Sequence, residues 1–139
     1  MGNGGETIHG PARMWLTVVT DGRPSEVVEV AKAPFVIGRD DGCDLVLGDD
    51  KVSRQHATIA RAMGIGRNLR DLGSANGTLV NGQPMKPAPG FTPSQERAMD
   101  LYGGEVLQFG DTIVLASLID PRLQQDWPGL QGDDDSEAE

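Results

Sequence analysis

Three short segments of this chain combine turn-forming residues with side chains that can donate hydrogen bonds to an anion. They are Gly38-Arg39, Val52-Ser53-Arg54-Gln55-His56-Ala57 and Asp71-Leu72-Gly73-Ser74-Ala75-Asn76-Gly77-Thr78. The donors are the guanidinium groups of Arg39 and Arg54, the hydroxyl of Ser53 and the amide of Asn76. An arginine fork matches two phosphate oxygens, and a hydroxyl with exposed backbone N–H groups can bind the others. The pattern predicts a site for a phosphorylated partner.

Short strands that end at turns are expected to position these donors. The apolar run 35–37 stops at Gly38, so Arg39 is expected at the mouth of a loop directly after a buried strand. Many such strand signals alternate with turns, and Asn81-Gly82 is typical of a tight hairpin. This pattern favours an all-β sandwich over helical folds. Near the end of the sheet, period-two alternation predicts four inward side chains, those of Leu107, Phe109, Ile113 and Leu115.

The chain divides into a folded region and two tails. Residues 1–13 mix glycine with isolated polar residues and are expected to form a flexible arm. Residues 14–120 would form the sandwich, with a surface insertion at about residues 86–100 because three prolines there oppose a central strand. Residues 121–139 are rich in acid and are expected to be a disordered tail.

Bulk composition excludes several classes of function. A chain of 139 residues with 37% hydrophobic content is long enough for one core, so we expect one domain and a monomer. The net charge of −9 opposes a nucleic-acid surface, which needs clustered cations. One cysteine, Cys43, forms no internal disulfide, and we expect neither a metal nor a cofactor. No apolar run approaches the ~20 residues of a membrane span, so we expect a cytoplasmic protein that does not bind membranes.

The three segments, in this order and followed by Val80-Asn81-Gly82, resemble the forkhead-associated (FHA) domain, a phosphothreonine-peptide binding module. The resemblance runs from about Trp15 to Leu118. It implies a β-sandwich of about eleven mostly antiparallel strands. It also implies a signalling adaptor that binds the phosphothreonine of a Ser/Thr-kinase substrate and performs no chemistry.

The resemblance also implies roles for single residues. Arg39 and Ser53 would bind the phosphate, Arg54 would bind at its edge, and Asn76 would bond the peptide backbone beside it. Five residues would shape the loops: Gly38, His56, Gly73, Ser74 and Gly77. The chain departs from the family at Ala75, where members often carry a hydroxyl or basic side chain. That departure removes one phosphate contact.

Two other functions remain open from the sequence. The domain could associate through a sheet face independently of phosphate, and Ala75 is the main support for this alternative. Ser53, His56 and Asp71 supply the residue types of a hydrolytic triad, as an esterase or phosphatase would need. Residues three apart in an extended segment point to opposite faces, so we expect His56 to be a buried structural residue and the protein not to be an enzyme.

The N-terminal arm carries one candidate phosphorylation site, Thr7. A phosphorylated Thr7 could fold back onto the pocket of its own domain. An extended chain from Thr7 to Trp15 spans roughly 26 Å at ~3.3 Å per residue, whereas strands of about six residues make the sandwich ~20 Å high. The sequence therefore allows self-binding with little length to spare.

Overall fold

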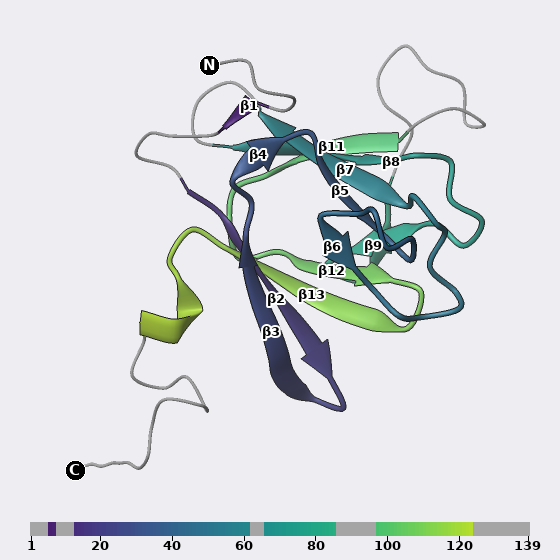
Figure 1. The fold of residues 1–139 in the computed structure, drawn as a ribbon, viewed down its shortest axis with the longest axis horizontal. Helices are drawn as coiled ribbons and strands as arrows, with labels where there is room; N and C mark the ends of the chain where they lie inside the picture. The colour runs from purple at the N-terminus through teal and green to yellow at the C-terminus, as the bar shows by residue number, and fades with distance from the viewer. Residues whose placement is uncertain (1–5, 8–12, 62–65, 86–96, 124–139) are drawn as a thin grey trace.

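Two β-sheets form the body of the molecule. The computed structural model describes residues 6–7, 13–61, 66–85 and 97–123. The first sheet has six strands in the order β10-β9-β12-β13-β2-β3, and the second has five in the order β11-β8-β7-β5-β6 (Figure 1). The predicted all-β sandwich is confirmed, and six plus five strands agree with the number that the resemblance implied.

The strands of both sheets are short. The six-stranded sheet contains β2 (Trp15–Thr20), β3 (Arg23–Glu29), β9 (Thr78–Val80), β10 (Gln83–Pro84), β12 (Val106–Phe109) and β13 (Thr112–Ser117). The five-stranded sheet contains β5 (Phe35–Gly38), β6 (Leu45–Val46), β7 (Ala57–Arg61), β8 (Arg67–Asp71) and β11 (Arg97–Leu101). A separate pair joins β1 (Glu6–Thr7) to β4 (Lys32–Ala33), and a 3₁₀ turn, η1 (Pro121–Leu123), follows β13.

One hydrophobic core lies between the two sheets. Alternate residues of each strand point inward, as the two-residue period of a β-strand requires. The fully buried aliphatic and aromatic side chains include Leu16, Ile37, Ile59, Leu69, Leu107 and Phe109. Burying one such side chain contributes about 1.5 to 3 kcal/mol, so the core holds the strand ends, and the loops that leave them, in place.

The prediction for β13 was wrong. Leu107 and Phe109 of β12 point inward as expected, but Ile113 is only partly buried and Leu115 is 37% exposed. In β13 the buried residues are Val114 and Ala116, because Leu107 pairs with Val114 across the hairpin. Directly paired residues share a face, so the register and not side-chain size decides which residues are buried.

An unusually short connection joins the parallel strands β5 and β6. Ile37 pairs with Leu45 in the parallel sense, although only residues 39–44 separate the two strands. Parallel neighbours ordinarily need a crossover of about a dozen residues or more. Hydrogen bonds at both ends hold this loop: the Asp44 backbone N–H donates to Val36 O at 2.8 Å, and the Leu47 backbone N–H donates to Gly38 O at 2.8 Å. Arg39 therefore begins a loop that is fixed at both ends.

The boundaries of the predicted tails and insertion differ from the structure. Two residues of the predicted flexible arm form β1, which pairs with Lys32–Ala33. The insertion was expected to reach residue 100, but Arg97–Leu101 forms β11 and pairs with all of β8. Residues 86–96 and 124–139, which hold the rest of the insertion and most of the acidic tail, lie outside the described residues. Within the described ranges no helix is long and apolar enough to cross a membrane.

Candidate functional site

Three loops meet at one end of the sandwich and carry the predicted donors. They are loop 39–44 between β5 and β6, loop 47–56 between β6 and β7, and loop 72–77 between β8 and β9. The Arg39 backbone N–H donates to Ser53 O at 3.0 Å, which joins the first two loops. The Asn76 side-chain Nδ2 donates to Lys51 O at 2.8 Å, which joins the second and third. The structure thus brings together three segments that are far apart in the sequence.

Arg39 is held by its backbone and by one side-chain nitrogen. Its Nε donates to Val52 O at 2.9 Å, which fixes the direction of the guanidinium plane. Within the described residues the two terminal Nη groups have no hydrogen-bond partner, and the residue is exposed. Two parallel N–H groups therefore face solvent in the geometry that suits two oxygens of one oxyanion.

The Ser53 hydroxyl accepts a hydrogen bond and can still donate one. Its Oγ accepts the Ala75 backbone N–H at 3.1 Å, so one lone pair is occupied by the neighbouring loop. A hydroxyl has one proton as well as two lone pairs, and no described group accepts the proton of Ser53. The half-buried hydroxyl can thus donate to an incoming acceptor.

The backbone carbonyl of Arg54 accepts hydrogen bonds from the neighbouring loop, and the residue as a whole is exposed to solvent. Arg54 O accepts the Asp40 backbone N–H at 3.1 Å and the Cys43 Sγ–H at 3.2 Å. A Cβ added at Gly38 would lie 2.1 Å from this carbonyl oxygen. Only glycine fits at position 38, because the backbone of the neighbouring loop occupies the space that a Cβ would need.

His56 is fully buried and joins two loops through its ring. Its Nδ1 accepts the Ser53 backbone N–H at 3.0 Å, so Nε2 carries the ring proton and donates to Gly77 O at 2.9 Å. The ring also packs edge-on against Phe109, with 5.4 Å between the centroids. Both nitrogens are bonded to backbone groups, so neither is available to take a proton from the Ser53 hydroxyl.

The sequence argument against a Ser53–His56 pair used the wrong geometry. Residues 53–56 form a bend, not an extended strand, and the imidazole folds back onto the backbone of Ser53. Asp71 Oδ2 lies 3.7 Å from His56 Nε2, beyond hydrogen-bond distance. The three residue types of a hydrolytic triad are therefore close together without the hydrogen bonds that a triad requires.

Asp71 organises the third loop from a buried position. Its carboxylate accepts the Ser74 backbone N–H at 2.8 Å, the Ser74 hydroxyl at 2.7 Å and the Thr78 hydroxyl at 2.7 Å. Ser74 Oγ also accepts the Gly77 backbone N–H at 2.9 Å, and both Gly73 and Gly77 have a positive φ that favours glycine. Burial acts to raise the pKa of Asp71, but the hydrogen bonds from Ser74 and Thr78 lower it overall.

Lowering the pH should reduce the free energy of unfolding of the domain, in part because Asp71 becomes protonated. Because its pKa is lower in the folded state, this carboxylate stabilises the fold above its unfolded pKa of about 3.9, and the contribution is lost as pH falls through the folded value. At neutral pH, Asp71→Asn should reduce the free energy of unfolding by about 1 to 3 kcal/mol, the cost of weakened bonds to a buried charged group. Urea unfolding of both proteins from pH 7 to pH 3 measures the difference, which should shrink on acidification. A difference that grows at low pH would contradict this assignment.

A family model for the FHA domain matches residues 35–115. The chain belongs to the FHA domain family. The matched range contains all three loops, and the suspected family resemblance is confirmed. No curated protein sequence matches the chain closely enough to serve as a relative.

Solved FHA structures share the fold over most of the domain. The FHA domain of the CT664 protein from Chlamydia trachomatis is 26% identical with a TM-score of 0.64, and the match covers 76% of this chain and 97% of that one. EmbR of Mycobacterium tuberculosis, solved with a low-affinity phosphopeptide, is 26% identical with a TM-score of 0.62, over 77% of this chain and 24% of EmbR.

A third structure contains a protein partner. The FhaA FHA domain, complexed with the intracellular domain of Rv3910, is 28% identical to this chain with a TM-score of 0.57. The match covers 74% of this chain and 98% of that one. Together with the family model, these complexes support a phospho-dependent protein interaction module with a phosphorylated protein as its partner.

The sequence did not single out Asp49, which anchors loop 47–56 of this FHA domain. Its carboxylate accepts the backbone N–H of Lys51 at 2.9 Å and of Asp111 at 2.8 Å, and the Thr112 hydroxyl at 2.7 Å. The hydrogen bond from Thr112 is the largest cause of its lowered pKa. The turn Gly48-Asp49-Asp50 was visible in the sequence, but its contact with the β12–β13 turn depends on pairing across 62 residues.

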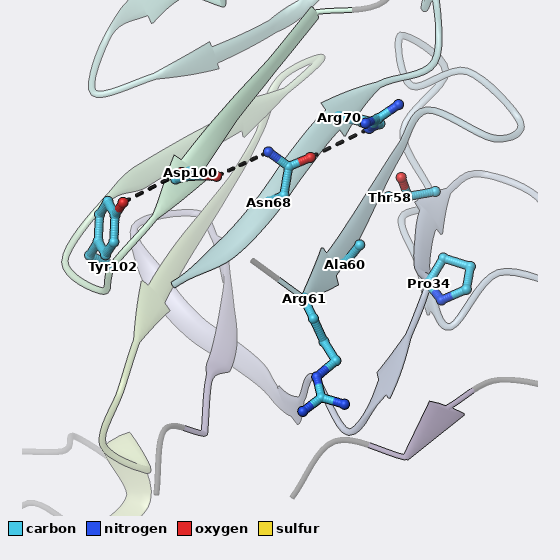
Figure 2. Close-up of a pocket in the computed structure, with 8 residues that line it drawn as sticks. All are labelled: Pro34, Thr58, Ala60, Arg61, Asn68, Arg70, Asp100 and Tyr102. Atoms are coloured by element: carbon cyan, nitrogen blue, oxygen red, sulfur yellow. Dashed lines mark hydrogen bonds between the residues drawn. The ribbon is translucent and has the colours of Figure 1, made fainter. Parts of the chain in front are cut away.

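A hollow of about 670 Å³ lies away from these loops, on the outer face of the five-stranded sheet. A row of hydrogen-bonded polar side chains crosses it from Tyr102 through Asp100 and Asn68 to Arg70 (Figure 2). None of its lining residues is a predicted donor of the phosphate site. In the described part of the chain no group of three or more His, Cys, Asp and Glu residues could hold a metal ion.

Proposed function

We propose that this FHA domain binds phosphothreonine in a partner protein through Arg39, Ser53, Arg54 and Asn76. The observation that carries the proposal is the hydrogen bonding of the first two residues. Arg39 is fixed by Nε with both Nη groups facing solvent, and Ser53 has its lone pair bonded to Ala75 and its proton available. The donors of two loops are thus oriented before a ligand arrives, and the third loop bonds to the second through Ala75 and Asn76.

The remaining residues supply the edge of the site and its support. Arg54 is exposed next to Ser53 and adds a second positive charge at the edge of the phosphate. The Asn76 amide, already bonded to Lys51 O, keeps one N–H and its carbonyl oxygen for the peptide backbone. The partner would be the substrate of a Ser/Thr kinase. Because both nitrogens of His56 are occupied, His56 does not activate Ser53, and we infer that the domain performs no chemistry.

One peptide sequence prepared with Thr, phosphoserine and phosphothreonine tests the proposal by calorimetry. Loss of the phosphate removes at least two charge-assisted hydrogen bonds of about 1.5 to 3 kcal/mol each, so the unmodified peptide should bind at least about 100-fold more weakly. The phosphothreonine form should bind best. Equal binding of all three forms would instead favour association through a sheet face, independent of phosphate.

Ala75 offers a gain-of-affinity test of the same site. Its backbone N–H bonds to Ser53 Oγ and the residue is exposed, so a side chain added here would lie beside the proposed phosphate position. Ala75→Thr should tighten phosphopeptide binding by up to ~1 kcal/mol, or about fivefold, the net gain of one hydrogen bond. Ala75→Val is the matched control, because it adds the same bulk without a hydroxyl. Equal affinities of the two variants would place the phosphate elsewhere.

Thr7 remains a candidate phosphorylation site. Binding of phosphorylated Thr7 to the pocket of its own domain would require the backbone pairing between β1 and β4 to break. The backbone of Thr7 pairs with Lys32, which precedes β5, whereas Arg39 follows the end of β5. The four residues of β5, about 13 Å of extended strand, therefore lie between the two positions along the sheet. Phosphorylated Thr7 could reach the pocket only after β1 separates from β4.

A further inference from the structure

The outer face of the six-stranded sheet is aliphatic. One row of paired residues across it reads Val106, Leu115, Thr17 and Val27. The next row reads Leu79, Gln108, Ile113 and Val19. No residue in either row is charged. We call the six aliphatic side chains of these rows the aliphatic face: Val19, Val27, Leu79, Val106, Ile113 and Leu115.

This composition is unusual for a solvated sheet surface. An antiparallel sheet with one face on the core ordinarily presents polar side chains on the other. The outer face of the five-stranded sheet follows that rule with Asn68, Arg70 and Asp100 (Figure 2). On the aliphatic face, by contrast, Val106 is 39% and Leu115 37% exposed. Val19, Val27, Leu79 and Ile113 are partly exposed, and Thr17 between Leu115 and Val27 is buried. Apolar side chains that cluster on a surface in this way indicate a contact surface.

The size of the aliphatic face favours a short segment as its occupant. Four strands at ~4.8 Å spacing and two rows ~7 Å apart give it a footprint of roughly 14 by 7 Å. A stable dimer buries about 800 Å² on each partner, several times more than this footprint provides. A single tryptophan side chain buries about 150–250 Å² over its whole surface, so one face of its ring covers an area of the same order as this footprint.

The chain leaves the sandwich beside this face. The adjacent row on the same side of the sheet reads Ser117, Trp15 and Glu29. Ser117 Oγ donates to Ile119 O at 2.6 Å, which turns the chain at the end of β13. Arg13 lies over the Trp15 ring at 5.1 Å and pairs with Glu29 at 2.8 Å.

Charged side chains of η1 and of the residue before it lie near this corner. The hydrogen bond from Arg13 is the main cause that lowers the pKa of Glu29, while the charge of Asp120 raises it and the charge of Arg122 lowers it. Asp120 in turn bonds Arg122 at 2.9 Å and attracts Arg13. The last described residue, Leu123, therefore ends a turn whose charged residues lie near Glu29 in the row Ser117–Trp15–Glu29. The aliphatic face begins one row, about 7 Å, further along the sheet.

We propose that residues 126–130 of the same chain fold back onto the aliphatic face, with Trp127 covering Leu115 and Leu130 packing beside it. After Leu123 the apolar side chains larger than alanine are those of Trp127, Pro128 and Leu130. Four residues from Leu123 to Trp127 reach about 13 Å and seven residues to Leu130 about 23 Å, both more than the ~7 Å between the row Ser117–Trp15–Glu29 and the first row of the aliphatic face. The tether keeps the segment at high local concentration, so a small contact suffices.

Methyl NMR spectra of the full chain and of Trp127→Ala test this proposal. The ring current of a docked indole shifts nearby methyl signals, so the signals of Leu115, Val106 and Val27 should move when Trp127 is replaced. Val46 is the matched control, because it is 41% exposed but lies on β6 of the other sheet. Leu115→Gln should abolish the shift difference, and nuclear Overhauser contacts should join the Trp127 ring to the Leu115 methyl groups.

Trp127 lies outside the described residues. Circular dichroism and the melting temperature of Trp127→Ala, compared with those of the parent, check that the variant is folded. Signals of Leu115, Val106 and Val27 that stay in place in Trp127→Ala would overturn the proposal. Shifts that depend on protein concentration, with a doubled mass in solution, would assign the aliphatic face to a second copy of the chain. That result would equally overturn docking of the segment.

Discussion

Replacing Arg39 with alanine should weaken the binding of a phosphothreonine peptide by on the order of 2 to 5 kcal/mol, about 30-fold to several thousand-fold. A phosphate carries about −1.5 to −2 charges at neutral pH, and Arg39 is the donor whose plane is already fixed by its bond to Val52 O. A micromolar complex has only about −8 kcal/mol of binding free energy, so this loss removes a large part of it. Calorimetry on the folded variant, checked by circular dichroism, measures the effect.

Arg23→Ala is the matched control for lost charge, because Arg23 is an exposed arginine on edge strand β3. It should bind almost as well as the parent. Ser53→Ala should cost somewhat less than Arg39→Ala, since it removes one donor instead of a charged fork. Asn76→Ala should weaken phosphorylated and unmodified peptides alike, because its bonds go to the peptide backbone. If Arg39→Ala binds as well as the parent, the phosphate site does not lie at these loops.

Replacing Gly38 with alanine should both destabilise the fold and reduce phosphopeptide binding. The added Cβ would lie 2.1 Å from Arg54 O and 3.0 Å from Cys43 Sγ. Backbone cannot move aside as a flexible side chain can, so the two loops must separate at a cost of about 1 to 3 kcal/mol or more. For a domain of this size the melting temperature should fall by on the order of 10 °C. Thermal unfolding followed by circular dichroism measures it.

Gly48→Ala provides the control for the same chemical change in a neighbouring loop. No atom lies within 4 Å of a Cβ built at Gly48, and its φ is not in the left-handed region. This variant should match or slightly exceed the stability of the parent, because alanine reduces the entropy of the unfolded chain. If Gly38→Ala and Gly48→Ala melt at the same temperature, loops 39–44 and 47–56 do not pack as closely as the structure shows.

The sequence predicted the fold and the grouping of the loops because both depend on local signals. Apolar runs that stop at turns marked most strands, and the order of the three segments indicated the family. The sequence also contains the information needed to predict which side chains of β13 point into the core, but our prediction for this strand was wrong. Gly110-Asp111 is a two-residue turn, so Phe109 pairs with Thr112 and Leu107 with Val114, and inward-facing Leu107 requires inward-facing Val114. Assigning the larger residues to the core ignored this register.

Other elements were not visible because their stability comes from distant partners. Arg97–Leu101 has few β-branched or aromatic residues, and it forms β11 because the edge of β8 offers unpaired backbone groups. The same holds for β1, whose two residues carry no strand signal of their own. For the site, the sequence predicted that His56 is a buried structural residue but not which groups its ring contacts. The bend that turns the ring onto Ser53 depends on packing against Phe109 and Gly77, which are distant in the sequence.

The short parallel connection between β5 and β6 has a consequence for the thermodynamics of binding. Fixing one residue of a flexible loop costs roughly 1 to 2 kcal/mol of conformational entropy, which a binding site with a mobile loop loses when its ligand arrives. In loop 39–44 that entropy has already been lost on folding, because the backbone of Arg39 bonds to Ser53 O and the backbone of Asp44 bonds to Val36 O. Association should therefore leave the backbone of Arg39 in place, and its rate should be set by electrostatic encounter rather than by loop closure.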